Sequence, residues 1–487
     1  MQFSFRKGFV LEVVAAFPGL APVSMTDGVS GGGGSGEADS IPVAAESDAV
    51  TERSSSNSGS GSSSGGNDAD AVYEERVSKL RRVLVEGFDI DLILNFLFTQ
   101  SHTDVSILQT VKTTTDNKGA VLHNSTVVAH AYMNCGTTQD SFLRENLDWL
   151  GKASNWAKFN AVASIGVVHK GHVHESMNLL APYLPRGGQS SSPYSEAGAL
   201  YALGLIHANK GGTGDSTVIS FLTEALRNSG TNGTVQHGAC LGIGLAAMAT
   251  GNEALFESLN GIVMQIDANA GEGAALGIGL LMLGMVDHPV AQNNIHDLLT
   301  FARETNCKEK ITRAIALAIA MMVYGKEEGA DPTIEQLCRD RDPLMRYGGA
   351  YAIAMAYCGT GNNSAIRRLL HIAVSDVNDD VRRAAVTCLG FVLFRSHESV
   401  PKLVSLLAES FNPHVRYGAC LAVGLSCAGS AFKDALDLLQ PMLEDPVDFV
   451  RQGAYMSMAL VLMQVAEARK QAVNSPLSNP ISLLTHY

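Results

Sequence analysis

The sequence predicts an all-α fold, an α-solenoid in which most of the chain is one continuous stack of helix pairs. Apolar residues follow a helical period from Tyr73 almost to the end of the chain. A motif of small residues (small-small-x-x-small-x-small, then an apolar residue) recurs every 34 to 41 residues, and amphipathic segments separate its copies. The copies begin at Asn160, Gly198, Gly238, Gly273, Ala314, Gly348, Ala384, Gly418 and Gly453.

The N-terminal segment, residues 1–72, has a different composition. It contains the runs GGGGSG and SSSNSGSGSSSGG and, between residues 26 and 70, very few large apolar side chains. Such a segment buries too little apolar surface to offset the entropy cost of ordering, so we expect it to be disordered. From Tyr73 the pattern VSKLRRVLVEGFDIDLILNFLF indicates helices, which begin a helical region at residues 73–150.

The repeats occupy residues 151–463. Small residues at offsets 0, 1, 4 and 6 of the motif lie on more than one face of a helix. Each interior glycine costs about 1 kcal/mol of helix propensity relative to alanine, and close packing on several sides is expected to compensate. We therefore interpret the motif as an inner helix flanked by its neighbours, and the amphipathic segment after it as an outer helix. The structural repeat positions are Gly198, Gly204, Gly238, Gly244, Gly273, Gly279, Gly348, Gly390, Gly418, Gly424 and Gly453.

The junctions before the motif support this phasing. Asp342-Pro343, Asn412-Pro413 and Asp445-Pro446 are typical of an N-cap followed by proline at the first helical position. Four arginines lie two residues before the small position, and with the acidic or Asn junctions they are expected to form a ladder of pairs between successive repeats. They are Arg346, Arg382, Arg416 and Arg451.

Composition argues against several partners. The formal charge of −13 is unfavourable for binding a nucleic-acid backbone. The apolar stretch from Gly273 to Val286 is too short for the roughly 20 residues that span a bilayer, so we expect no membrane partner. Eight cysteines without a C-x-x-C pair indicate buried free thiols in a reducing compartment.

No cofactor, metal or catalytic site is predicted. Gly242 and Gly244 form a G-x-G without a third glycine or a preceding strand, which argues against dinucleotide binding. The histidines of HKGHVH lie in a polar turn without further ligands at zinc spacing, and the carboxylates of SDVNDD fit helix capping better than calcium binding. These candidates are His169, His172 and His174, and Asp376, Asp379 and Asp380.

Several long segments resemble the proteasome/cyclosome repeat family. They include NCGTTQDSFLRENLDWLGKASNWAKFNAVASIGVVHKGH, LYALGLIHANKGG, AYCGTGNNSAIRRLLHIAVSDVNDDVRRAAVTCLGF and NPHVRYGACLAVGL. The resemblance runs from about Val77 to Met463. This family occurs in the two largest non-ATPase subunits of the proteasome regulatory particle and in the largest anaphase-promoting-complex subunit, and the segments are most similar to a proteasomal member.

The resemblance implies a non-catalytic scaffold in the cytoplasm and nucleus. In the family the repeats form a toroid preceded by a helical rod, and the subunit contacts proteasome ATPase subunits, lid subunits and ubiquitin receptors during degradation of ubiquitinated proteins. Residues 73–150 would then be a remnant of the rod. Family members are longer at both ends, so we expect a truncated chain, an incomplete toroid, and an irregular tail at 464–487 in place of the segment that docks a ubiquitin receptor.

Two other function classes fit parts of the pattern. A general helical-repeat adaptor, such as a cyclosome-like or transport factor, would share the fold and differ in its partners. An α/α-toroid enzyme would need acidic residues converging at the toroid mouth. Asn378 stands where the cyclase-type D-x-D-D motif requires aspartate, which disfavours the enzyme.

Overall fold

The computed structural model describes residues 76–79, 92, 105–115, 120–185, 192–211, 216–304, 308–394 and 396–463. The segments expected to be disordered (1–72) or irregular (464–487) lie outside these residues. The chain divides into two compact units, Met1–Ile90 and Asp91–Tyr487, and the helices below belong to the second. Its regular secondary structure, within the described ranges, is entirely helical, which confirms the all-α prediction.

Among the described residues from 105 to 150, four helices precede the repeats. They are α4 (Val105–Thr115), α5 (Ala120–Met133), α6 (Ser141–Glu145) and α7 (Leu147–Leu150). Phe142 of α6 and Trp149 of α7 pack edge to face, with ring centroids 6.0 Å apart, in a small core that includes Ala161 of the first inner helix. Helix α5 contacts that inner helix, so the N-terminal helices continue directly into the stack.

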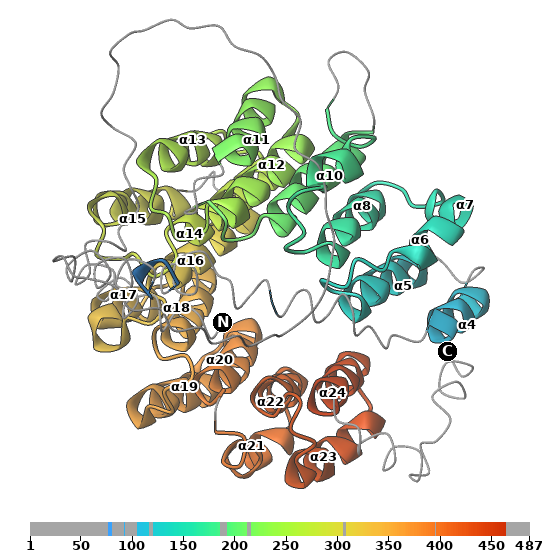
Figure 1. The fold of residues 1–487 in the computed structure, drawn as a ribbon. Helices are drawn as coiled ribbons and strands as arrows, with labels where there is room; N and C mark the ends of the chain where they lie inside the picture. The colour runs from blue at the N-terminus through green and yellow to red at the C-terminus, as the bar shows by residue number, and fades with distance from the viewer. Residues whose placement is uncertain are drawn as a thin grey trace, which may run out of the picture. The chain divides into compact units, whose positions relative to one another are not determined.

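Every copy of the small-residue motif lies in an inner helix, and each inner helix packs beside the next (Figure 1). The inner helices are α8 (Trp156–Val168), α10 (Pro193–Ile206), α12 (Gly233–Ala246), α14 (Ala268–Leu281), α16 (Glu309–Met322), α18 (Pro343–Ala356), α20 (Asp379–Val392), α22 (Pro413–Ser426) and α24 (Asp448–Val461). This arrangement confirms the predicted α-solenoid.

Between the inner helices run the shorter or more amphipathic outer helices. They are α9 (Ser176–Leu180), α11 (Ser216–Asn228), α13 (Glu253–Val263), α15 (Pro289–Ala302), η2 (Glu327–Ala330) with α17 (Asp331–Cys338), α19 (Asn363–Ser375), α21 (Val400–Ala408), and α23 (Lys433–Leu439) with η3 (Gln440–Glu444). Helix α19 is typical, because Ile366 and Leu369 are buried against the inner layer while Val374 faces solvent.

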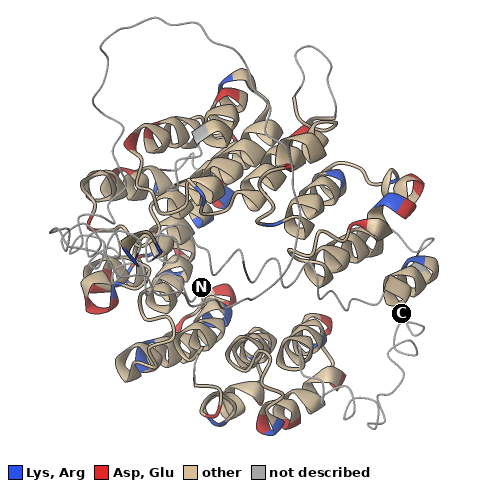
Figure 2. Cartoon of the chain, in the orientation of Figure 1, with Lys and Arg blue, Asp and Glu red and all other residues tan. Residues whose placement is uncertain are grey.

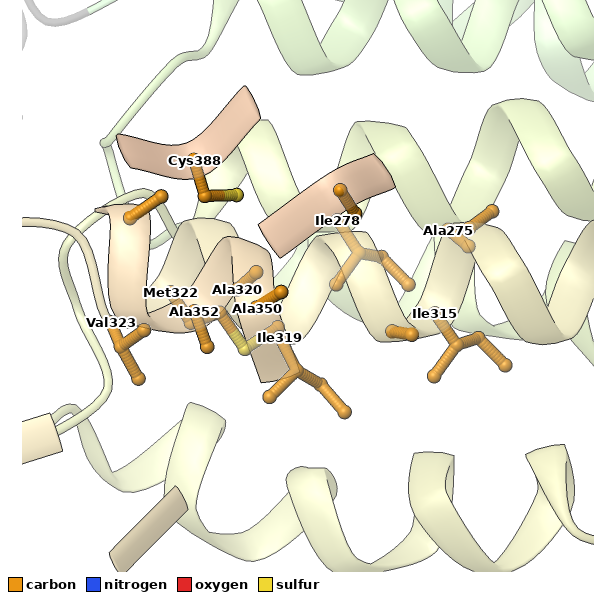
Figure 3. Packing of buried hydrophobic residues seen from close by; sticks show 14 of the residues in the cluster. Ala275, Ile278, Ile315, Ile319, Ala320, Met322, Val323, Ala350, Ala352 and Cys388 are labelled. Atoms are coloured by element: carbon orange, nitrogen blue, oxygen red, sulfur yellow. The ribbon is translucent and has the colours of Figure 1, made fainter. Parts of the chain in front are cut away.

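One hydrophobic core runs through the repeats, from Val162 in α8 to Val461 in α24. Figure 3 shows part of it, where Ile278, Ile315, Ala350 and Cys388 come from successive inner helices. Charged residues form only short patches along the helices (Figure 2). A core that passes from repeat to repeat makes each repeat depend on its neighbours for burial.

The helix caps match the predicted junctions at two of three places. The side chains of Asp342 and Asn412 accept hydrogen bonds from the first turns of α18 and α22, with proline next in each case. The prediction for Asp445-Pro446 is wrong, because α24 begins at Asp448 with Val447 at the N-cap position. Asp445 lies two residues earlier, and its Oδ1 accepts the backbone N–H of Val447 at 2.9 Å.

The turn after an inner helix binds the end of the next inner helix through its backbone. The N–H groups of Gly359 and Gly361 donate to the carbonyl oxygens of Phe391 (2.9 Å) and Val392 (3.0 Å). These bonds satisfy carbonyls at a helix end that have no partner inside the helix. Both glycines have positive φ, of 70° and 64°. At equivalent places, positive φ also occurs at the non-glycine residues Asn209, Ala249 and Ala431.

Candidate functional site

The glycine at offset 6 of the motif faces the following inner helix. A methyl group on Gly244 would lie 2.6 Å from the Cα of Gly277, and one on Gly279 would lie 2.7 Å from the Cα of Ala318. Both distances are below the 3.0 Å that real Cβ atoms respect. Gly204, Gly390 and Gly424 make the same approach to Gly242, Ala422 and Ser457.

The glycine at offset 0 faces the preceding inner helix. A methyl group on Gly198 would lie 2.6 Å from the carbonyl oxygen of Phe159, and one on Gly238 would overlap the carbonyl oxygen of Ala197. Gly273, Gly348 and Gly418 meet His237, Ala316 and Arg383 in the same way. Gly453 differs, because its nearest neighbour is the ring of Tyr417, at 2.8 Å.

Each inner helix therefore meets one neighbour through offset 0 and the other through offset 6. Offset 4 completes the contact from the opposite side, since methyl groups on Gly242 and Gly277 would lie 2.6 Å from carbonyl oxygens of the preceding helix. The sequence predicted close packing on several sides, but it does not show which neighbouring helix each offset meets. The structure assigns offset 6 of one repeat to offset 4 of the next.

The arginine ladder forms at two junctions. Arg346 makes a bidentate pair with Asp376 of the next junction (Nε to Oδ2 2.7 Å, Nη2 to Oδ1 3.1 Å). Arg416 pairs with Asp445 in the same way (2.7 and 3.0 Å). The side chains of both pairs are largely buried, with exposed fractions of 8–17%. Bidentate pairs of this kind combine charge with geometric specificity.

Two opposing effects act on the pKa of Asp376, and burial alone would raise it. The hydrogen bonds from Arg346 and from the backbone N–H of Asn378, together with the guanidinium charge, outweigh burial and hold the pKa below its usual range. The pKa of Asp445 is likewise lowered, because hydrogen bonds from Arg416 and from the N–H of Val447 outweigh burial. Both carboxylates are therefore ionised partners in the folded state at neutral pH.

The ladder prediction is wrong at Arg382. Its Nε donates to the carbonyl oxygen of Ala373 (3.1 Å), and its Nη1 lies 3.7 Å from Asp379 in the same helix. Ser410 occupies the place that Asp376 and Asp445 take at the neighbouring junctions, so the next repeat offers no carboxylate there. Arg451 also bonds within its own junction, to Asp448 and to the carbonyl oxygen of Asp445.

Replacing Ser410 by aspartate is expected to complete the missing rung. A partly exposed pair with Arg382 should raise the free energy of unfolding by about 0.5–1 kcal/mol. Chemical denaturation of the Ser410→Asp chain measures the gain, and a double-mutant cycle with Arg382→Ala isolates the pair. An equal gain in the Arg382→Ala background would show that the new carboxylate acts through another group.

Acid should weaken the ladder. Because the folded-state pKa values of Asp376 and Asp445 are lowered, their contribution to stability is complete above the unfolded carboxyl pKa of about 3.9 and is lost as pH falls through the folded values. Urea unfolding between about pH 6 and about pH 3 measures this loss. Asp376→Asn should be less stable near neutrality and lose less stability in acid. An unchanged acid slope would contradict the assignment.

The candidate catalytic and metal-binding groups have other partners or lie apart. His169 Nε2 lies 3.5 Å from Asp140 and His172 Nε2 contacts the carbonyl oxygen of Gly136, while His174 is exposed. Burial lowers the pKa of His169 despite the Asp140 charge. Asp376 holds Arg346 and Asp380 holds Arg383. Over the described ranges, no three His, Cys, Asp or Glu side chains are placed to hold a metal ion.

The described cysteines are free thiols, and several are poor nucleophiles. Burial raises the pKa of Cys420 to about 12 and that of Cys427 to about 11. Cys240 and Cys388 are wholly buried, and burial raises the pKa of each. A protonated thiol neither attacks an electrophile nor binds a metal well. Cys307 lies outside the described residues. No helix in the described part of the chain combines the length and hydropathy needed to cross a bilayer.

Comparison with known proteins places the stack among named relatives. A family model described as HEAT repeats matches residues 366–459. Over 408 residues the chain is 52% identical to 26S proteasome non-ATPase regulatory subunit 1 homolog B of Arabidopsis thaliana, an alignment that covers 83% of this chain and 40% of the relative. It is 48% identical to 26S proteasome non-ATPase regulatory subunit 1 of Drosophila melanogaster over 399 residues (82% and 38%).

A fungal proteasome subunit is similar to this chain to nearly the same degree. Over 401 residues, 81% of this chain and 42% of the relative, the sequence is 47% identical to 26S proteasome regulatory subunit RPN2 of Candida glabrata. The chain thus spans about two fifths of the length of the curated relatives it matches. These relatives are named as regulatory subunits.

Proposed function

Because four fifths of this chain is homologous to part of 26S proteasome non-ATPase regulatory subunit 1, we propose that it is a non-catalytic scaffold of the proteasome regulatory particle. In this role it contributes to the base and helps to organise ATPase, lid and ubiquitin-receptor subunits for ubiquitin-dependent protein degradation. Cytoplasm and nucleus are the compartments that this role requires.

The observation that carries the proposal is sequence identity of 47–52% with these relatives over 81–83% of the chain. The stack suits a frame physically. Inner helices that touch backbone to backbone on both sides resist sliding, and the junction turns bind each repeat to the next. Solenoids of this type present long surfaces on which partners assemble. The raised thiol pKa values and the paired carboxylates support a role without chemistry.

The test is incorporation into the particle. A chain carrying an affinity tag, expressed in eukaryotic cells, is expected to co-purify with proteasomal ATPase and lid subunits in stoichiometric amounts by quantitative mass spectrometry. A chain with the stack disrupted by Gly238→Ala serves as the matched control and should recover less. Recovery of the tagged chain without proteasomal subunits would refute the proposal.

A general helical-repeat adaptor is the second candidate. The match of residues 366–459 to HEAT repeats favours it, because this description implies a helical scaffold and names no particular assembly. The same purification distinguishes the two. Stoichiometric recovery of cyclosome or transport components in place of proteasomal subunits would establish the adaptor.

A further inference from the structure

Two apolar side chains project into solvent from neighbouring junctions. Phe411, between α21 and α22, is fully exposed (104% relative accessibility), and Val377, between α19 and α20, is 92% exposed. The two residues occupy the same place in successive repeats, immediately before the N-caps Asn412 and Asn378. Full exposure leaves the whole apolar surface of the ring available to a partner, and burial of such a ring is strongly favourable.

The turn that carries Phe411 is held firmly. Arg416 Nη1 donates to the carbonyl oxygens of Ser410 (2.8 Å) and Phe411 (3.1 Å), while its other nitrogens bind Asp445. The Oδ1 of Asn412 caps α22 through the N–H of His414, at 2.8 Å. These bonds therefore fix the backbone of the turn that carries Phe411. A turn whose backbone is already ordered loses less entropy when a partner binds it.

A direct bond links the two junctions. Asn412 Nδ2 donates to Asp379 Oδ1 at 2.6 Å, which ties the residue after Phe411 to the second residue after Val377. Val374, three residues before Val377 at the end of α19, is 70% exposed. We call Val374, Val377 and Phe411 the rim patch. Val377 and Phe411 lie on adjoining turns that are bonded to each other, and Val374 lies in the last turn of α19, just before the first of them.

In the first turns of α20 and α24, three carboxylates are more exposed than the arginines that pair with them. The side chains of Asp379, Asp380 and Asp448 are 52%, 42% and 86% exposed. The arginines of the same junctions are drawn inward, with exposed fractions of 15–33% at Arg382, Arg383, Arg416 and Arg451. Figure 2 shows the acidic residues at α20 and α24. A partner therefore meets carboxylates first.

We propose that the rim patch docks another protein subunit of the same assembly, through an apolar pocket that receives Phe411 and is bordered by Lys or Arg. This inference rests on the proposed scaffold function and assigns it a surface. Phe411 supplies the buried aromatic anchor that dominates many interfaces, and Val374 and Val377 extend the apolar contact. The exposed carboxylates guide the basic border of the partner and select against acidic surfaces.

The first test compares two substitutions of one residue in the tagged chain. Phe411→Asp places a charge in the apolar contact and is expected to reduce incorporation into the regulatory particle at least severalfold. Phe411→Tyr keeps the ring and should incorporate normally. Because the ring is fully exposed in the free chain, both variants should unfold at the wild-type temperature. Equal incorporation of the Asp and Tyr variants would overturn the proposal.

Charge is tested separately. Asp448→Lys should reduce incorporation, and the reduction should shrink as the salt concentration of the purification rises, since screening weakens contacts between charges. Asp448→Asn is its matched control and should have a smaller effect. Incorporation of Asp448→Lys at the wild-type level would exclude a basic border on the partner.

The reaction rate of a cysteine placed at position 411 measures directly whether a partner covers the rim patch. Phe411→Cys in the purified particle should react with a maleimide at least tenfold more slowly than in the free chain, whereas Glu257→Cys on α13 reports general access of the reagent. If the chain enters the particle and Cys at position 411 reacts as in the free chain, the docking proposal fails alone. If the wild-type chain does not enter the particle, the scaffold function fails and the docking proposal fails with it.

Discussion

Replacing Gly238 by alanine should destabilise the stack by about 2–3 kcal/mol, although alanine is the better helix former. The added methyl group would overlap the carbonyl oxygen of Ala197 on α10. Backbone cannot move aside as a flexible side chain can, so α10 and α12 must separate. Because each repeat depends on its neighbours, the change should also split unfolding into two transitions, one on each side of this interface.

Chemical denaturation and hydrogen exchange measure this effect, with faster exchange expected in α10 and α12. Gly261→Ala is the matched control. Gly261 lies within α13 with nothing within 4 Å of the position of an added methyl group, so alanine should stabilise the chain by up to about 1 kcal/mol through helix propensity. Equal responses of the two glycines would mean that the close approach of α10 and α12 does not govern stability.

Replacing Arg416 by alanine is expected to cost about 3 kcal/mol. The substitution leaves Asp445, whose side chain is only 8% exposed, without its charge partner, and it also removes the donor to the carbonyl oxygens of Ser410 and Phe411. Removing one partner of a buried ion pair is strongly destabilising, because the other charge stays buried without compensation. Thermal and denaturant unfolding of the purified chain measure the loss.

Arg339→Ala is the control for Arg416→Ala. Arg339 pairs with Glu335 one helical turn away on α17, and its side chain is 82% exposed. Its removal should change the free energy of unfolding by less than about 0.5 kcal/mol. A loss at Arg416 no larger than the loss at Arg339 would show that the ladder contributes no more than an ordinary surface pair.

The sequence predicted part of the arginine ladder, but the arginines alone did not show which of them find a carboxylate in the next repeat. Arg346 and Arg416 bind across the junction as expected, but Arg382 does not. The deciding residue lies about 30 positions further along the chain, two residues before the next N-cap, where Asp376 and Asp445 stand and Ser410 replaces them. Alignment of the junctions on one another reveals this position, whereas the arginines alone do not.

The backbone conformation of the junction turns could not be predicted from composition either. Glycine marks many of them, yet Ala249 and Ala431 adopt positive φ without it. Their backbone N–H groups bond the carbonyl oxygens of Leu280 and Val461 in the next inner helix, which offsets the cost of the left-handed conformation. A local sequence contains no record of a hydrogen bond to a helix that begins many residues later.

By itself, the sequence determined the helical repeat, the assignment of inner and outer helices, and the positions where small residues are required. It could do so because helical periodicity and the steric demand for glycine recur at regular spacing along the chain. Tertiary structure alone decided which face of an inner helix meets which neighbour. It also decided that Arg382 bonds the carbonyl oxygen of Ala373 and that Phe411 and Val377 project from adjoining junctions. These features depend on contacts between segments remote in sequence, and the pairing of such segments is set by packing in three dimensions.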